Sequence, residues 1–239
     1  ILTDAENGMG PSGTGGHNTI GMADSEELAY EFGKVTAITA RNMGYNVVCN
    51  PLLDMVKGPS IASGNRRSMG SNKYRVAKLG AAVARVMHDA GVLTVGKHYP
   101  SAEKTDGRPI DSHMAESFSP VTEEELVDYC LFPYLELMKE GLLDGVMTSH
   151  CRIPNIDPDY PASLSKKVIS IIRKLGFDGF VIADFGAVRM LNSTHHTAQN
   201  GCEAGQMAIN AGLDVEAPNI YGFGPELVEK FRSGQLPMT

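Results

Sequence analysis

The sequence predicts an α/β protein built as a (β/α)₈ TIM-type barrel, and two recurring patterns support this prediction. Short apolar segments that end in polar residues are each followed by an amphipathic helical stretch, which is typical of a parallel sheet with crossover helices. The loops after these segments are long, whereas several loops before them are short, such as residues 175–178. Because such a barrel carries its active site on the loops that follow the strands, this difference in loop length favours the barrel.

Six segments of the chain are expected to be strands, since each has the length and apolar content of a buried strand. They are residues 1–6, 46–54, 92–99, 145–151, 179–186 and 213–217. A closed barrel of this type has eight strands, so we expect a barrel that is incomplete at its N-terminal end and also at its C-terminal end. A doubly wound sheet is the alternative. The segment GMGPSGTGGHN does not lead directly into a capped helix as a dinucleotide-binding turn does, which argues against it.

Helix boundaries are also visible in the sequence. Asp24 and Thr122 are each followed three residues later by a glutamate, which is the spacing of a capping box. Ser165 is expected to begin a helix that Gly176 ends, because glycine readily takes the left-handed conformation found after a helix. The apolar stripe of that helix consists of Val168, Ile171, Ile172 and Leu175.

The composition indicates one globular domain over residues 1–239. With 239 residues and 42% hydrophobic content, the chain can bury one sizeable core. The formal charge of −7 is spread over mixed stretches without a run of Lys or Arg, which excludes nucleic acid and an anionic membrane surface as expected partners. The oligomeric state stays open.

The cysteines and the apolar segments say little about the compartment. Four widely spaced cysteines without a CxxC pair are expected to be buried thiols rather than zinc ligands or a disulfide framework. No segment approaches the roughly 20 apolar residues that span a bilayer. The chain begins inside an expected strand, so a signal upstream would not be visible, and the compartment stays open with the cytoplasm slightly favoured.

Ionisable side chains end nearly every expected strand. Burying such groups is costly unless partners or a ligand satisfy them, so their succession at one end of a barrel indicates a functional site. In chain order they are Asp4 and Glu6, Asp54, Lys97 and His98, His150, Asp184, and Asp214 with Glu216.

Several motifs carry a family resemblance. The segments VGKHYP, DSH at 111–113, VMTSHCRIPNIDPDYPASLS and KLGFDGFVIADFGAV occur in this order along the chain. Together with NPLLD and NRRSMG, they resemble the N-terminal barrel domain of glycoside hydrolase family 3, over almost the whole chain. The resemblance implies a retaining β-glycoside hydrolase, acting without a cofactor on terminal non-reducing β-linked sugars of a small carbohydrate substrate.

The resemblance also implies roles for particular residues. Asp184 matches the nucleophile of the family, and an aspartate suits the role because a carboxylate can stabilise and then bond to the oxocarbenium-like sugar carbon. Asp111 and His113 match the Asp-x-His dyad of the bacterial β-N-acetylglucosaminidases, in which the histidine is the general acid and base. Sugar-binding positions of the family are matched by Asp4, Arg67, Lys97, His98 and, more weakly, His150. No residue is implied to hold a metal.

Departures from the family pattern leave two enzyme readings open. KHYPSAEKTDG stands where the family usually has KHFPGHG, which puts the path of the dyad loop in doubt. IADFGAV and AGLDVEAP resemble the β-glucosidase branch, whose acid is a glutamate in another domain. The chain is therefore expected to be β-N-acetylhexosaminidase-like, with a β-glucosidase-like enzyme as the alternative.

Three functions other than glycoside hydrolysis also stay open. His98, His150 and Asp184 at adjacent strand ends could hold the metal of a metal-dependent hydrolase. Lys97 could form a Schiff base as in barrel aldolases. The chain could also be a carbohydrate-binding barrel without turnover.

Overall fold

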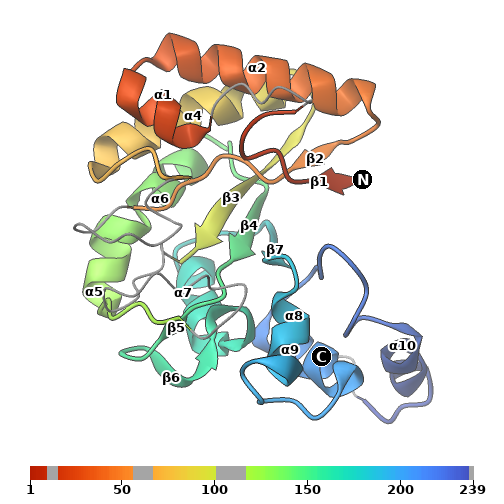
Figure 1. Cartoon of the computed structure of the whole chain (residues 1–239). Coiled ribbons are helices and arrows are strands. Elements are labelled where there is room, and N and C mark those ends of the chain that lie inside the picture. Colours follow the sequence, from red (N-terminus) through yellow and green to blue (C-terminus); the bar gives the residue numbers. More distant parts are fainter. Residues whose placement is uncertain (10–15, 56–66, 101–116, 237–239) are drawn as a thin grey trace.

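The described part of the chain forms one curled parallel sheet covered by helices (Figure 1). The computed structural model describes residues 1–9, 16–55, 67–100 and 117–236. The sheet has five strands in the order β1, β2, β3, β4 and β7, and all neighbouring pairs are parallel. The bounds are β1 (Leu2–Thr3), β2 (Val47–Val48), β3 (Leu93–Tyr99), β4 (Gly145–Thr148) and β7 (Phe180–Ala183). The predicted barrel architecture is confirmed as an open, curled part of a barrel.

The strands are shorter than the sequence predicts, and the last predicted strand is only a contact. Five of the predicted segments each contain one strand of the sheet. In the sixth segment, residues 213–217, only Val215 pairs with the sheet, through a parallel bridge to Ile182 of β7. Asp4, Glu6, Asp54, His150 and Asp184 therefore lie after the ladders, whereas Lys97 and His98 lie within β3 near its end.

Helices connect the strands and cover one face of the sheet (Figure 1). Their bounds are α1 (His17–Ala23), α2 (Glu26–Asn42), α4 (Lys73–Asp89), α5 (Glu123–Glu125), a π-helical segment (Leu126–Cys130), α6 (Phe132–Lys139), α7 (Lys166–Lys174), α8 (Ala187–Ser193), α9 (Gly201–Ala211) and α10 (Pro225–Arg232). Among the described residues, no helix has the length and apolarity needed to cross a membrane.

A short antiparallel hairpin follows β4 and was not predicted. It consists of β5 (Arg152–Ile153) and β6 (Asp157–Pro161), and a 3₁₀ turn (Ala162–Leu164) joins it to α7. Its residues include three prolines and lack a run of β-branched side chains, so the sequence carries no strand signal there.

The predicted helix boundaries are right in two cases and wrong in one. Thr122 and Ser165 accept the backbone N–H groups of Glu125 and Val168, as a helix N-cap does. Asp24 is not an N-cap. It ends α1 in the left-handed conformation, with φ 49°, and Ser25 caps α2 instead by accepting the N–H of Leu28. Ser25 is followed three residues later by Leu28 and so lacks the capping-box spacing that Asp24 has with Glu27, which explains the wrong choice.

The predicted stripe of α7 is buried except at its last position. Val168, Ile171 and Ile172 face the core, whereas Leu175 is 38% exposed. Leu175 is the C-cap of the helix, and Gly176 follows in the left-handed conformation with φ +95°. The chain has left the helix at this point, so the helical period no longer directs the side chain inward. All four cysteines are buried thiols, as predicted.

Alternation along the strands separates an outer core from an inner layer. Val146 and Val181 belong to the large cluster under the helices. Their neighbours on the other face of the sheet form a small apolar layer inside the curl, made of Cys49, Val95, Met147, Ile182 and Ala217. Side chains two residues apart on a strand share a face. Lys97 and Asp184 follow Val95 and Ile182 by two residues, so they are directed to the inner side, just beyond this layer.

Ser165 joins α7 to the hairpin, and its replacement by alanine is expected to lower the free energy of unfolding by about 1–2 kcal/mol. Its hydroxyl accepts the Val168 N–H at 3.1 Å and donates to the buried Asp157 carboxylate at 2.7 Å. Urea unfolding measures the change. Ser170→Ala is the control, because that hydroxyl only donates to the Lys167 carbonyl on the same helix. Equal midpoints for the two variants would contradict this account of the cap.

Candidate active site

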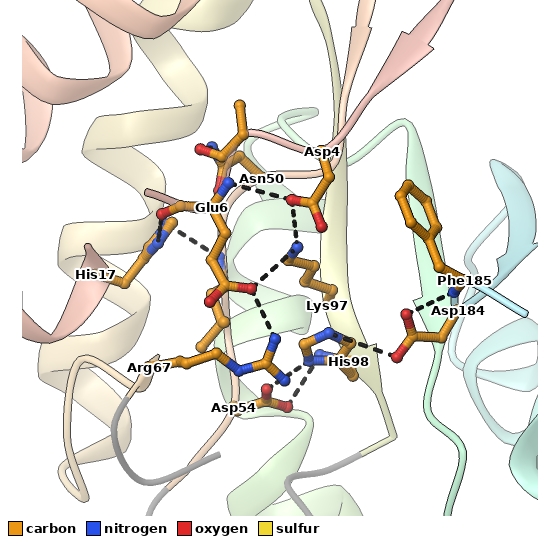
Figure 2. Close-up of polar contacts among 12 residues, drawn as sticks. Asp4, Glu6, His17, Asn50, Asp54, Arg67, Lys97, His98, Asp184 and Phe185 are labelled. Atoms are coloured by element: carbon orange, nitrogen blue, oxygen red, sulfur yellow. Dashed lines mark hydrogen bonds and ion pairs between the residues drawn. The ribbon is translucent and has the colours of Figure 1, made fainter. Parts of the chain in front are cut away.

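The polar residues that end the strands converge at one edge of the sheet (Figure 2). Asp4 follows β1, Lys97 and His98 end β3, and Asp184 follows β7. Parallel strands bring their carboxyl ends to the same edge, which is why residues far apart in the sequence meet there.

Lys97 is the centre of one half of this network. Its side chain is 0% exposed, and Nζ lies 2.7 Å from Asp4 Oδ1 and 3.2 Å from Glu6 Oε2. Burial alone would lower the pKa of Lys97, but the carboxylates of Asp4 and Glu6 outweigh it, and the pKa lies above its usual value. The ammonium group is therefore kept charged between two carboxylates.

Glu6 connects Lys97 to Arg67. A guanidinium N–H of Arg67 donates to Glu6 Oε2 at 2.8 Å, so one carboxylate oxygen serves both cations (Figure 2). Glu6 is buried, and such a charge is tolerated because it is paired. The arrangement fixes where both cations present their remaining N–H groups.

His98 forms the second half of the network with Asp54. Asp54 Oδ1 accepts the backbone N–H of His98 at 2.9 Å, and Oδ2 lies 2.7 Å from His98 Nδ1. Burial would raise the pKa of Asp54, but His98 and Arg67 outweigh it, and the pKa lies below its usual value. For His98, burial would lower the pKa, and the carboxylates of Asp54 and Asp184 raise it above its usual value.

Asp184 lies between two histidines. Its Oδ2 is 3.7 Å from His98 Nε2 and 3.3 Å from His150 Nε2, and its Oδ1 accepts the backbone N–H of Phe185 at 2.7 Å. The residue is 4% exposed. A carboxylate in this setting has a fixed orientation, with one oxygen directed at the imidazoles.

A cavity adjoins the network between the ends of β1 and β7. It measures about 340 Å³, within the roughly 300–1,000 Å³ of small-molecule sites. Its lining residues include Asp4, Phe185 and Glu216. Glu216 is held by the backbone N–H groups of Tyr221, Gly222 and Phe223, so it organises a loop.

The first turn after β1 is fixed by two buried side chains. Asn50 donates to the Ala5 carbonyl at 2.9 Å. His17 Nε2 accepts the N–H of Leu52 at 3.1 Å, so the other ring nitrogen, Nδ1, carries the proton and donates to the Glu6 carbonyl at 3.0 Å. Burial lowers the pKa of His17 to about 4, in agreement with a neutral ring.

This histidine gives the stability a predictable pH dependence. Its pKa is about 4 in the folded chain against 6.5 when unperturbed, so its contribution is complete above about pH 6.5 and is lost as the pH falls toward 4. The loss amounts to about 3 kcal/mol. In urea unfolding series from pH 7 to pH 4, the stability difference between wild type and His17→Gln is expected to narrow by this amount. A His196→Gln control, at an exposed position, should parallel the wild type, and a constant difference for His17→Gln would contradict the prediction.

Comparison with known proteins identifies the family. The description "Glycosyl hydrolase family 3 N terminal domain" matches residues 1–239. The chain belongs to this family. A beta-hexosaminidase of Pseudomonas aeruginosa is 30% identical over 194 residues, which cover 80% of this chain and 55% of that protein. The beta-hexosaminidase LpqI of Mycobacterium tuberculosis is 28% identical over 97% of this chain and 59% of its own length.

Solved structures of the family superpose on the fold. A glycoside hydrolase family 3 beta-N-acetylglucosaminidase from Paenibacillus has a TM-score of 0.80 at 29% identity, covering 99% of this chain and 46% of that one. The M. tuberculosis LpqI structure has a TM-score of 0.81 at 26% identity, covering 99% and 72%. The family 3 chain spans a little over half the length of the curated relatives that it matches.

The structure joins most of the predicted site residues of this family 3 chain in one place. Those brought together are Asp4, Arg67, Lys97, His98, His150 and Asp184. Asp111 and His113 lie outside the described residues. Glu6 and Asp54 were noted only as strand-end residues and were missed as members of the site. For Glu6 a signal existed, because it follows Asp4 by two residues in an extended segment and so faces the same side.

The metal reading gains no geometric support from the described residues. Within residues 1–9, 16–55, 67–100 and 117–236, no three His, Cys, Asp or Glu side chains are grouped in a way that suits a metal ion. His98 directs Nδ1 to Asp54, and its Nε2 stands 3.7 Å from Asp184. Lys97 is kept charged between Asp4 and Glu6, whereas a Schiff base forms on a neutral amine, so its setting does not favour the Schiff-base role either.

Proposed function

We propose that this chain is the barrel domain of a retaining β-glycoside hydrolase of family 3 that resembles β-N-acetylhexosaminidases. It would act on terminal non-reducing β-linked sugars through a covalent glycosyl-enzyme on Asp184, and residues 1–239 would form one domain. The relatives named beta-hexosaminidase support the substrate class. The chemistry requires a nucleophile and an acid, and no cofactor.

The main support for this proposal is the position of Asp184 and the contacts of its carboxylate. A retaining hydrolase needs an anionic oxygen that is fixed near the anomeric carbon, because the transition state there is oxocarbenium-like. Asp184 is held by the Phe185 N–H and stands beside two imidazoles at the edge of the sheet where barrel enzymes carry their sites.

The ion-pair network suits recognition of a sugar. Asp4 can accept hydroxyl protons and Lys97 and Arg67 can donate to hydroxyl oxygens, while their mutual contacts hold them in position. The cavity lined by Asp4 and Phe185 adjoins this network and is the space proposed for the ring. Asp184 is not among the described residues that line it, so the ring would extend from this cavity toward the carboxylate. His98 and His150 would contact the sugar from the side of Asp184.

For the acid and base we propose the dyad of Asp111 and His113. His113 would protonate the leaving oxygen and then take a proton from the attacking water, and Asp111 would orient the imidazole. This part rests on the DSH motif alone, since both residues lie outside the described ranges.

A β-glucosidase-like activity is the second candidate, and two relatives whose names lie outside the hexosaminidases agree with it. A beta-xylosidase of Formosa agariphila is 27% identical over 80% of this chain. A beta-glucoside phosphorylase structure has a TM-score of 0.79 at 25% identity. The segment IADFGAV around the nucleophile is the feature of this chain that agrees with this branch. In that case the acid would lie outside residues 1–239.

The deciding experiment compares p-nitrophenyl N-acetyl-β-glucosaminide with p-nitrophenyl β-glucoside and is followed by labelling. Hydrolysis of the first substrate supports the hexosaminidase reading, and hydrolysis of the second alone supports the alternative. A mechanism-based fluorosugar followed by peptide mass spectrometry should label Asp184. A label on another residue would overturn the assignment, and tight sugar binding by calorimetry without turnover would leave a carbohydrate-binding barrel.

A further inference from the structure

We propose that Asp54 is a positioning residue of this site, which fixes the ring orientation and the proton-bearing nitrogen of His98 so that Nε2 faces Asp184. The inference rests on the proposed function of Asp184. It assigns a task to a carboxylate that stands behind His98, away from the nucleophile.

The geometry of the pair leaves His98 little freedom. Asp54 uses one oxygen for the backbone N–H of His98 and the other for the ring nitrogen Nδ1, at 2.9 and 2.7 Å. Asp54 is itself 2% exposed, and its backbone carbonyl accepts the hydroxyl of Ser68. The Asp54 carboxylate therefore holds both the backbone and the ring of His98. Figure 2 shows the two contacts as dashed lines.

The protonation of the ring follows from this contact. A carboxylate can only accept at Nδ1, so Nδ1 carries a proton and Nε2 is the nitrogen that changes its state. Nε2 is the atom 3.7 Å from Asp184 Oδ2. The charged groups near the ring are Asp54, Asp184 and Arg67, of which Arg67 opposes protonation. The imidazole of His150 contacts the same Asp184 oxygen, Oδ2, at 3.3 Å.

This arrangement has a consequence for the nucleophile. Carboxylates on both sides favour the imidazolium form of His98, and an imidazolium beside Asp184 favours the ionised carboxylate. An ionised Asp184 is the state that can attack the anomeric carbon. Asp54 therefore acts on the nucleophile through His98, without touching the sugar.

A second aspartate that contacts a histidine ring and a backbone N–H lies at the opposite end of the sheet and supplies a control. Asp144 Oδ2 accepts the backbone N–H of Thr94 at 2.8 Å and lies 2.6 Å from His88 Nε2. This pair lies at the beginning of β3 and β4, whereas the site lies at their other ends. An Asp-to-Asn change at either position removes the same kind of acceptor.

The test replaces Asp54 by asparagine and measures two quantities in the full chain. The asparagine oxygen can still accept the backbone N–H of His98, but its amide N–H₂ cannot accept a proton from Nδ1, so the ring must take the other tautomer. The kcat/KM for the β-glycoside is expected to fall by between about 10² and 10⁴. The pH at which His98 titrates, followed by ¹⁵N NMR of the imidazole, should fall by at least about one unit.

Each outcome supports or overturns the role proposed for Asp54. Asp144→Asn should leave both the His98 titration and the pH profile of kcat/KM as in the wild type. If Asp54→Asn lowers only the unfolding midpoint and leaves the titration and the pH profile unchanged, Asp54 is structural and the proposal is wrong. If the variant does not fold, the wild-type spectrum still decides, because an unprotonated Nδ1 in neutral His98 would overturn the proposal. Absence of wild-type turnover would refute the proposed function while the NMR result on Asp54 stands.

Discussion

Replacing Asp184 by asparagine is expected to lower kcat/KM for the preferred p-nitrophenyl β-glycoside on the order of 10⁴-fold, or about 5 kcal/mol of transition-state stabilisation. The amide fills the same space and can keep the contact with the Phe185 N–H through its oxygen. It lacks the negative charge that stabilises the oxocarbenium-like carbon and the nucleophilicity that forms the ester. Initial rates over a range of substrate concentrations measure the effect.

A matched variant separates this loss from a general effect on the strand. Asp178 precedes the same strand, β7, at its opposite end and is exposed, so Asp178→Asn should retain wild-type kcat/KM. Activity lost by Asp184→Asn because of misfolding would be accompanied by a lower unfolding midpoint, which circular dichroism would detect. Full turnover by a folded Asp184→Asn protein would refute the nucleophile assignment.

The sheet and its polar edge could be predicted because both follow from local patterns. Val95 and Lys97, or Ile182 and Asp184, stand two residues apart, so an apolar inner layer and a charged rim are implied by strand periodicity alone. The order of the segments along the chain then brings the rim residues to one edge. Hence most of the residues that meet at this edge could be named without knowledge of their partners.

The pairings within the site depend on distances that the sequence does not contain. Asp54 lies beyond β2, and the turn in between decides whether its carboxylate meets His98 or solvent. Glu6 shares a face with Asp4, but only the position of Arg67, reached through a connection after β2, shows that it bridges two cations. The hairpin β5–β6 was missed for another reason. Its strands are short and proline-rich, and tertiary packing after β4 holds them together.

Lys97→Met is expected to have the largest effect on stability, lowering the free energy of unfolding by about 3–5 kcal/mol at pH 7. Methionine has a similar length but no charge, so Asp4 and Glu6 would face each other around an apolar side chain, with Arg67 left to compensate Glu6 alone. Urea unfolding monitored by circular dichroism measures the loss. Removal of an N–H donor from the proposed sugar site should also lower kcat/KM.

The pH dependence distinguishes a lost ion pair from a simple packing defect. Without Lys97, the negative charges of Asp4 and Glu6 repel each other as long as both carboxylates are ionised. Lower pH reduces the negative charge and with it the repulsion, so the stability deficit of Lys97→Met should be smaller at pH 5 than at pH 8. Lys34→Met removes an exposed lysine that pairs with Glu31 on a helix surface, and it should change stability by less than about 0.5 kcal/mol at either pH. A deficit in Lys97→Met that is the same at both pH values would show that Lys97 contributes through its packing, and the charge of the network would then have no part in holding the edge of the sheet.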